Sequence, residues 1–204
     1  EFRRVLFRSV TKGGEVSAVV LNSGGANACT GPQGFADTHK TAELIAEKLQ
    51  ISAGEVVVCS TGLIGEFLPM AKIAAGINEI QLTSNGFEDS ARAIMTTDSV
   101  PKMAEVVVGG AHFSGIAKGA GMLAPAMATM LSVVMTDAEV DPLEASKAFS
   151  RAVELTYNRL DSDGCTSTND TVLFMSSGAS GIKLSATEIQ DALNELCGSL
   201  ASQL

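Results

Sequence analysis

Residues 115–131 read GIAKGAGMLAPAMATML and form the most informative segment of this chain of 204 residues. Small residues surround one charged side chain, Lys118, and Ala128 and Thr129 lead into an apolar run that predicts a strand over residues 129–136. Glycine lacks a Cβ atom, so such a loop can bring main chain very close to another group. A threonine at its end suits a chain that cuts its own backbone, because the free α-amine of an N-terminal threonine can act as the general base for its own hydroxyl.

Strands and helices are expected to alternate around this segment. Short apolar, β-branched runs predict strands at residues 16–21, 55–59, 103–108, 112–117, 129–136 and 171–175. Apolar residues at helical spacing predict helices at residues 36–49, 67–80, 87–95, 141–158 and 185–200. Ser185 and Glu188 are spaced as a capping box at the start of the last helix. The alternation favours a layered α/β or α+β domain.

Composition narrows the class of protein. Hydrophobic residues make up 46% of the chain and aromatic residues only 4%, so the core must be built mainly from small and aliphatic side chains. The net charge is −9 without a basic stripe, which argues against nucleic acid as a partner. No apolar run has the length of a membrane span, so we expect no membrane association. The four cysteines lie far apart without a CxxC motif, which favours reduced, buried thiols in a cytoplasmic protein.

Several kinds of catalytic site are poorly supported. The chain has only two histidines, His39 and His112, and lacks the GxSxG motif of many Ser-His-Asp hydrolases. It also lacks the HExxH motif of zinc proteases. The sequence DSDG at residues 161–164 resembles the start of a calcium loop without its remainder, and we interpret it as a solvated, capped turn. We therefore expect no metal site.

A dinucleotide-binding fingerprint is matched by Gly119, Gly121 and Ala124, with Asp137 and Glu139 near the spacing of a ribose-binding acid. That fingerprint must open a helix whose N-terminus faces the pyrophosphate. Here proline follows directly, and the next apolar segment favours a strand. The match is therefore weak.

Two further segments could line a site, although each taken alone is read more simply as a turn after a strand. NSGGANACTG at residues 22–31 offers small residues and amide side chains. Thr61 and Gly62 follow the strand predicted at residues 55–59, and an amide N–H beside a threonine hydroxyl offers two donors to a developing oxyanion. Lys118 would either reach solvent or place its ammonium in a pocket for a carboxylate.

Together these segments closely resemble the ornithine acetyltransferase family, whose members act as glutamate N-acetyltransferases in arginine biosynthesis. The matching motifs, in collinear order, are VVLNSGGANACTG at 19–31, STGLIG at 60–65, AIMTTDSVPK at 93–102, GIAKGAGMLAPAMATML at 115–131 and STNDTV at 167–172. The resemblance implies a self-processing α+β layered sandwich of the kind that the family shares with DmpA-type aminopeptidases. It implies that residues 10–128 belong to an α chain and residues 129–204 begin a β chain of one continuous domain.

The resemblance also implies the role of each site residue. The precursor would cut itself autocatalytically between Ala128 and Thr129, and Thr129 would then be the nucleophile that carries the acetyl group. Thr61 and Gly62 match the oxyanion-hole pair of the family. Lys118 matches a substrate-binding lysine, and Thr96, the first threonine of the Thr-Thr-Asp motif, matches another substrate contact beside Thr129 itself.

The implied substrates are N2-acetylornithine and glutamate, with acetyl-CoA as a second candidate donor that separates bifunctional from monofunctional members. No other cofactor is expected, and the α and β chains are expected to form an α2β2 heterotetramer in the cytoplasm. Residues 1–9 do not fit the family pattern, and we expect them to be vector-derived sequence or a fragment boundary. The resemblance also implies a further C-terminal region that supplies pocket residues, which we expect to be missing from this sequence. Two alternatives remain open: a related self-processing aminopeptidase or amidohydrolase, and an inactive, uncut fragment.

Overall fold

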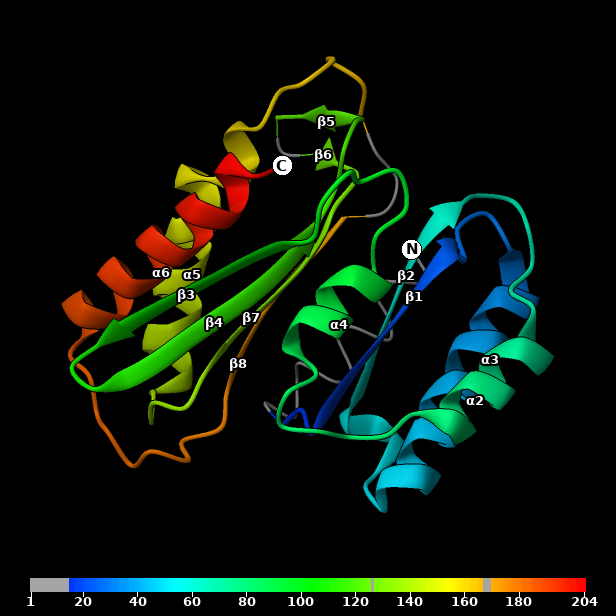
Figure 1. Cartoon of the computed structure of the whole chain (residues 1–204), viewed down its shortest axis with the longest axis horizontal. Coiled ribbons are helices and arrows are strands. Elements are labelled where there is room, and N and C mark those ends of the chain that lie inside the picture. The colour runs from blue at the N-terminus through cyan, green and yellow to red at the C-terminus, as the bar shows by residue number, and fades with distance from the viewer. Residues whose placement is uncertain (1–14, 126, 167–169) are drawn as a thin grey trace. The chain divides into compact units, whose positions relative to one another are not determined.

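The chain divides into two compact units, Glu1–Gly86 and Phe87–Leu204. The structure, a computed structural model, describes residues 15–125, 127–166 and 170–204, so the expectation for residues 1–9 lies outside the described residues. Figure 1 shows that each unit combines strands with helices packed against them, as the predicted layered α/β class requires. The predicted boundary between Ala128 and Thr129 falls inside the second unit.

The first unit is a parallel strand pair covered by two helices. Strand β1 (Ala18–Gly25) pairs in parallel with β2 (Val56–Leu63). Helix α2 (Gly31–Leu49) packs against β2 and α3 (Met70–Glu79), and a short 3-10 turn spans Ala53–Glu55. The small core of this unit is made of Ala42, Ile45, Ala46, Val56 and Ile77.

Periodicity predicts that helix α2 begins at residue 36, but in the structure it begins at Gly31. Pro32 lies in its first turn, where a missing N–H costs nothing. The Asn27 amide donates to the Gly34 carbonyl at 2.9 Å, and the Thr30 hydroxyl donates to the Asn27 side-chain oxygen at 2.8 Å. Side-chain hydrogen bonds therefore fix a helix start in sequence that looks like loop.

The second unit is built on a four-stranded sheet in the order β3-β4-β7-β8. Strand β4 (Ala111–Lys118) is antiparallel to both β3 (Lys102–Val108) and β7 (Leu131–Thr136). Strand β8 (Thr171–Ser176) runs parallel to β7. Gly109 and Gly110 form the turn between β3 and β4, with φ angles of 59° and 89°. Positive φ explains the glycine pair there.

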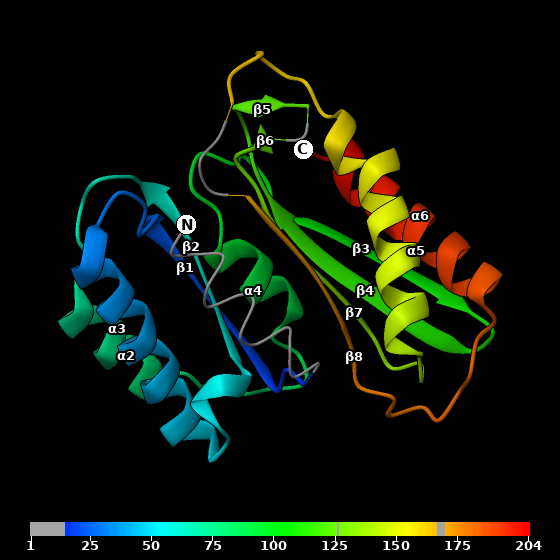
Figure 2. The ribbon, with the colours of Figure 1, turned by 180° about the vertical axis from the view of Figure 1, so that it is seen from behind.

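Helices α5 (Pro142–Leu155) and α6 (Ala186–Ser202) cover one face of this sheet, as Figure 2 shows from behind. A 3-10 turn, Tyr157–Arg159, follows α5. The predicted capping box at Ser185 and Glu188 is present. Helix α4 (Phe87–Ala93) lies against β3 and β4. The core between the sheet and the two long helices includes Phe113, Val134, Leu193, Leu196 and Leu200.

The strand predicted at residues 129–136 is present, but its predicted first residue is wrong. Strand β7 begins at Leu131, and Thr129 lies in a bend that follows a short antiparallel hairpin, β5 (Leu123–Ala124) with β6 (Met127–Ala128). Sequence patterning missed this hairpin because two-residue strands carry no periodicity. Residues 119–124 therefore lead into a hairpin and not into a helix, which removes the structural context that the dinucleotide fingerprint needs.

Two other expectations can be compared with the structure. Cys59 and Cys197 are buried as predicted, but Cys29 and Cys165 are exposed because both lie in polar loops. None of the helices in the described ranges is long and apolar enough to cross a bilayer.

Candidate active site

The Ala128–Thr129 peptide bond immediately follows strand β6, the second strand of the β5–β6 hairpin. Ala128 pairs with Leu123, and the amide nitrogen of Thr129 then donates a hydrogen bond to the carbonyl oxygen of Met122 at 2.7 Å. Thr129 is partly exposed, whereas the next residue, Met130, is buried. The bond that the sequence predicts to be cut is thus flanked by strand pairing at Ala128 on its N-terminal side and by the Thr129 N–H hydrogen bond on its C-terminal side.

Met122 adopts an unusual backbone conformation that a neighbouring carboxylate supports. Its φ angle is +54°, in the left-handed region that residues other than glycine rarely occupy. Its N–H donates to Asp163 at 2.8 Å, and the same carboxylate accepts from the Cys165 N–H at 3.1 Å. These backbone hydrogen bonds hold the pKa of Asp163 below its ordinary value.

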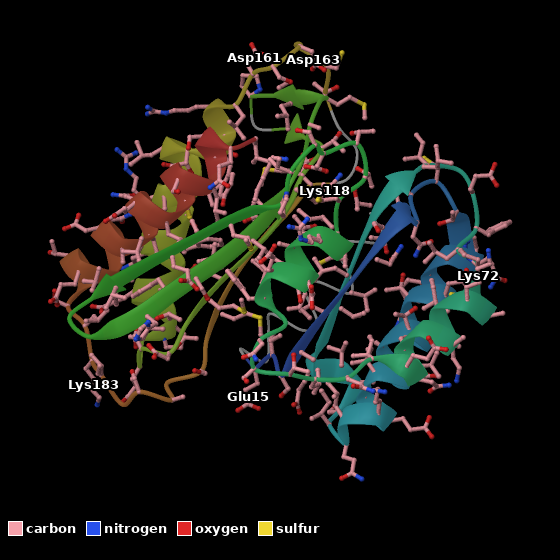
Figure 3. All side chains as sticks on the ribbon, in the orientation of Figure 1. Glu15, Lys72, Lys118, Asp161, Asp163 and Lys183 are labelled. Carbon is pink, nitrogen blue, oxygen red and sulfur yellow. The ribbon has the colours of Figure 1, made fainter. Side chains whose placement is uncertain are left out.

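The polar loop around Asp163 is the capped turn that the sequence predicts. The Gly164 N–H donates to Asp161 at 3.0 Å, and the Ser162 N–H donates to the Leu123 carbonyl at 2.8 Å. Figure 3 labels Asp161 and Asp163 in this loop. The loop therefore braces the hairpin that precedes Thr129.

Gly119 marks a close approach between two segments. A Cβ atom at this position would lie 3.1 Å from the Thr129 carbonyl oxygen and 3.0 Å from a Leu204 methyl group. Both distances are tighter than ordinary van der Waals contact. The glycine thus brings the end of β4 beside the predicted nucleophile, as the sequence suggests for this loop.

Lys118 lies buried at the end of β4, where Figure 3 labels it, with its side chain only 3% exposed. Its ammonium donates to the Thr96 hydroxyl at 2.7 Å and lies 3.9 Å from Asp98. Burial lowers the pKa of Lys118 and the neighbouring Lys102 lowers it further, while Asp98 opposes both. The structure therefore brings together the two residues, Thr96 and Lys118, that the sequence predicts to contact substrate.

Asp98 and Lys102 complete this buried cluster. The Asp98 carboxylate is fully buried and accepts hydrogen bonds from the Lys102 ammonium at 2.5 Å, the Gly119 N–H at 2.7 Å and the Thr96 N–H at 3.2 Å. Burial alone would raise the pKa of Asp98, but these hydrogen bonds outweigh it and the pKa lies below the ordinary value.

Thr61 and Gly62 lie at the end of β2 in the first unit. Thr61 is buried, with 1% of its surface exposed. Gly62 pairs with Gly24 and has φ +132°, and a Cβ atom there would lie 2.3 Å from the Gly24 carbonyl carbon. Only glycine fits such a backbone. The strand pair therefore fixes the main chain at the predicted oxyanion-hole residues.

Sequence reasoning missed four residues of this arrangement: Asp98, Lys102, Met122 and Asp163. Asp98 and Lys102 had a signal, because both are charged residues inside the motif AIMTTDSVPK. Met122 contributes through its main-chain conformation and Asp163 through a carboxylate that accepts main-chain N–H groups; the sequence has no pattern that predicts either contact. Within the described ranges, no group of three or more His, Cys, Asp or Glu side chains is placed to hold a metal ion. Part of the STNDTV motif, residues 167–169, lies outside the described residues.

The ArgJ family model matches residues 5–204. The chain belongs to the ArgJ family. Among curated members, it is 53% identical over 197 residues to the arginine biosynthesis bifunctional protein ArgJ of Streptomyces coelicolor, covering 96% of this chain and 51% of that protein. It is 53% identical over 193 residues to the ArgJ protein of Thermobifida fusca, covering 94% and 50%. The chain thus spans about half the length of these ArgJ relatives.

Two solved ArgJ structures are similar in fold. The ArgJ crystal structure from Bacillus halodurans aligns with a TM-score of 0.56 at 40% identity, over 62% of this chain and 70% of that one. The ornithine acetyltransferase of Mycobacterium tuberculosis, solved in complex with ornithine, aligns with a TM-score of 0.51 at 43% identity, over 61% and 70%. The predicted resemblance and the predicted fold class are therefore confirmed.

Proposed function

We propose that the protein carrying this chain is a glutamate N-acetyltransferase of arginine biosynthesis that cuts itself between Ala128 and Thr129. The observation that carries the proposal is the setting of Thr129. Its N–H is held by the Met122 carbonyl at 2.7 Å, and its carbonyl lies against Gly119, next to the buried Lys118. Membership of the ArgJ family supports the same conclusion.

Self-cutting begins at the amide bond that leaves the hairpin. The Thr129 hydroxyl oxygen attacks the carbonyl carbon of Ala128, and the bond to the Thr129 nitrogen breaks, which gives an ester and a free α-amine. Water then hydrolyses the ester, leaving a carboxylate on Ala128. The α-amine has an ordinary pKa near 8. It can therefore take the proton of its own hydroxyl near neutral pH.

Acetyl transfer uses the same hydroxyl twice. Thr129 attacks the acetyl carbonyl of N2-acetylornithine, the amide bond breaks, and ornithine leaves with the proton on its amine. The amine of glutamate then attacks the acetyl-threonine ester and releases N-acetylglutamate with the hydroxyl restored. Two half-reactions through one covalent intermediate predict ping-pong kinetics.

Four other residues complete the proposed machinery. Thr61 and Gly62 donate to the oxyanion of each tetrahedral intermediate, where such donors are typically worth about 3–4 kcal/mol. Lys118 and Thr96 hold the α-carboxylate that acetylornithine and glutamate share. The hydrogen bond of 2.7 Å between Lys118 and Thr96 supports this pairing, since it orients the ammonium.

The family resemblance extends the proposal to donor, assembly and location. Acetyl-CoA is a second acetyl donor to test, and no other cofactor is required by the chemistry. The two products of the cut are proposed to stay together as α and β chains of an α2β2 assembly in the cytoplasm. A self-processing aminopeptidase would use the same cut and the same oxyanion donors, but membership of the ArgJ family favours the transferase.

The test supplies acetylornithine with and without glutamate and follows both acetylglutamate and free acetate. Transfer to glutamate without net hydrolysis supports the proposal. Hydrolysis that does not depend on glutamate identifies an amidohydrolase. A single uncut species by intact mass, without either activity, identifies an inactive chain.

A further inference from the structure

Asp98 lies at the centre of the buried charged cluster in the second unit. Three donors reach its carboxylate, from Lys102 on β3, Gly119 at the end of β4 and Thr96 in the turn after α4. The Lys118 ammonium lies 3.9 Å away. A carboxylate with no exposed surface persists only where it is paired and hydrogen-bonded, so these contacts are interdependent.

The two lysines of the cluster have different partners. Lys102 makes the short contact with Asp98, at 2.5 Å, and is itself buried. Lys118 donates instead to the Thr96 hydroxyl at 2.7 Å. Asp98 therefore makes its short ion pair with Lys102 and a longer one, at 3.9 Å, with Lys118, and the Lys118 ammonium donates its short hydrogen bond to Thr96.

The same carboxylate reaches the surroundings of the nucleophile. It binds the Gly119 N–H, and a Cβ atom at Gly119 would lie 3.1 Å from the Thr129 carbonyl oxygen. Movement of the β4 end would therefore shift both Lys118 and the main chain that packs against Thr129. One side chain thus links the proposed carboxylate-binding pair to the proposed nucleophile.

We propose that Asp98 is a positioning residue for acetyl transfer. It fixes the positions of Lys118, Thr96 and the Gly119 main chain relative to one another, and the Lys102 ammonium keeps the buried Asp98 carboxylate anionic. This inference rests on the proposed function of Lys118 and Thr96 as the pair that holds the substrate carboxylate. Asp98 itself contacts neither the nucleophile nor the substrate.

The first test separates positioning from stability with a double variant. Asp98→Asn keeps an acceptor for the Gly119 N–H but removes the charge, and it leaves Lys102 as an unpaired buried cation. Adding Lys102→Met removes that cation, and neutral replacement of a buried ion pair is often tolerated by a fold. The double variant should therefore melt near the wild-type temperature.

Its kinetics should nevertheless stay impaired. We expect kcat/KM to fall on the order of 100-fold, as misplaced binding groups commonly cause. The loss should appear mainly as raised KM for both acetylornithine and glutamate, because they share the carboxylate. A double variant with wild-type KM values, or one that does not fold, would overturn the proposal.

A second readout does not require the proposed activity. The ammonium of Lys118 is titrated by NMR in the wild type and in the double variant, with its signal assigned by Lys118→Arg. Among the described residues, Asp98 raises the pKa of Lys118 and Lys102 lowers it. The single variant Lys102→Met is the matched reference. It differs from the double variant only at Asp98, so the comparison isolates the effect of the Asp98 charge on the Lys118 pKa.

Relative to Lys102→Met, the double variant should show a lower Lys118 pKa, because it lacks the Asp98 charge that raises it. An unchanged Lys118 pKa would contradict the positioning role even if the enzyme were active. If the wild type transfers no acetyl group, the proposed function fails, and this titration still decides whether Asp98 holds Lys118.

Discussion

The amide nitrogen of Thr129 lies 2.7 Å from the carbonyl oxygen of Met122 and donates a hydrogen bond to it. Before the chain is cut, this hydrogen bond fixes the position of the Thr129 nitrogen, which becomes the free α-amine after cleavage. After the cut, the same carbonyl is an acceptor for one proton of the liberated α-amine. The contact therefore links the hairpin to both the self-cutting step and the later role of the amine as base.

Replacing the nucleophile should abolish both activities. Thr129→Ala removes the hydroxyl that attacks Ala128 and later carries the acetyl group, so neither a cut chain nor acetylglutamate should form. Thr129→Ser is the matched control, because it keeps the hydroxyl and should retain both reactions at reduced rate. Intact mass and acetylglutamate formation measure the two. Wild-type transfer by Thr129→Ala would show that the nucleophile lies elsewhere.

Gly119→Ala should slow self-cutting. The added methyl group would lie 3.1 Å from the Thr129 carbonyl oxygen and 3.0 Å from a Leu204 methyl group, so the two segments must separate by a few tenths of an ångström. Gly121→Ala is the matched control in the same loop, since its nearest neighbour would be Asp163 at 3.5 Å, an ordinary contact. The fraction of cut chain over time, by mass spectrometry, should fall behind wild type only for Gly119→Ala. Equal rates for the two variants would contradict the close approach.

Gly62→Ala should destabilise the first unit as well as the proposed oxyanion hole. Its Cβ atom would lie 2.3 Å from the Gly24 carbonyl carbon, and its φ of +132° strains any other residue. Gly76→Ala, in the exposed face of α3 with nothing within 4 Å, should instead stabilise by about 0.5–1 kcal/mol. Thermal melts compare the two. A Gly62→Ala melt equal to wild type would refute the predicted clash.

Acid should weaken the support that Asp163 gives to the β5–β6 hairpin, through its hydrogen bond from the Met122 N–H, only at unusually low pH. Hydrogen bonds from Met122 and Cys165 depress the pKa of Asp163 in the folded chain. A depressed folded pKa means that the support is fully present above the ordinary carboxyl pKa and is lost as pH falls through the lower, folded value. An NMR titration of the Met122 amide in wild type should follow that value, and Asp163→Asn should abolish the titration. A midpoint at or above the ordinary value would contradict the brace.

The sequence predicted the architecture well where apolar spacing is regular and failed where main-chain geometry decides. The buried strands and amphipathic helices appear near their predicted positions because burial of one face sets their periodicity. The setting of Thr129 was misjudged, because a hairpin of two-residue strands and the left-handed Met122 arise from tertiary hydrogen bonds. Asp98 was overlooked for a related reason: its partners Lys102, Thr96 and Gly119 meet only once β3 and β4 pair.

The central claim is that Thr129 carries the acetyl group. The most direct measurement incubates the cut protein with N2-acetylornithine in the absence of glutamate, quenches in acid and analyses the peptide that begins Thr-Met-Leu-Ser. We predict that this peptide gains the mass of one acetyl group on Thr129 and loses it when glutamate is added. Transfer of acetyl groups to glutamate while this peptide stays unmodified at every time point would contradict the account.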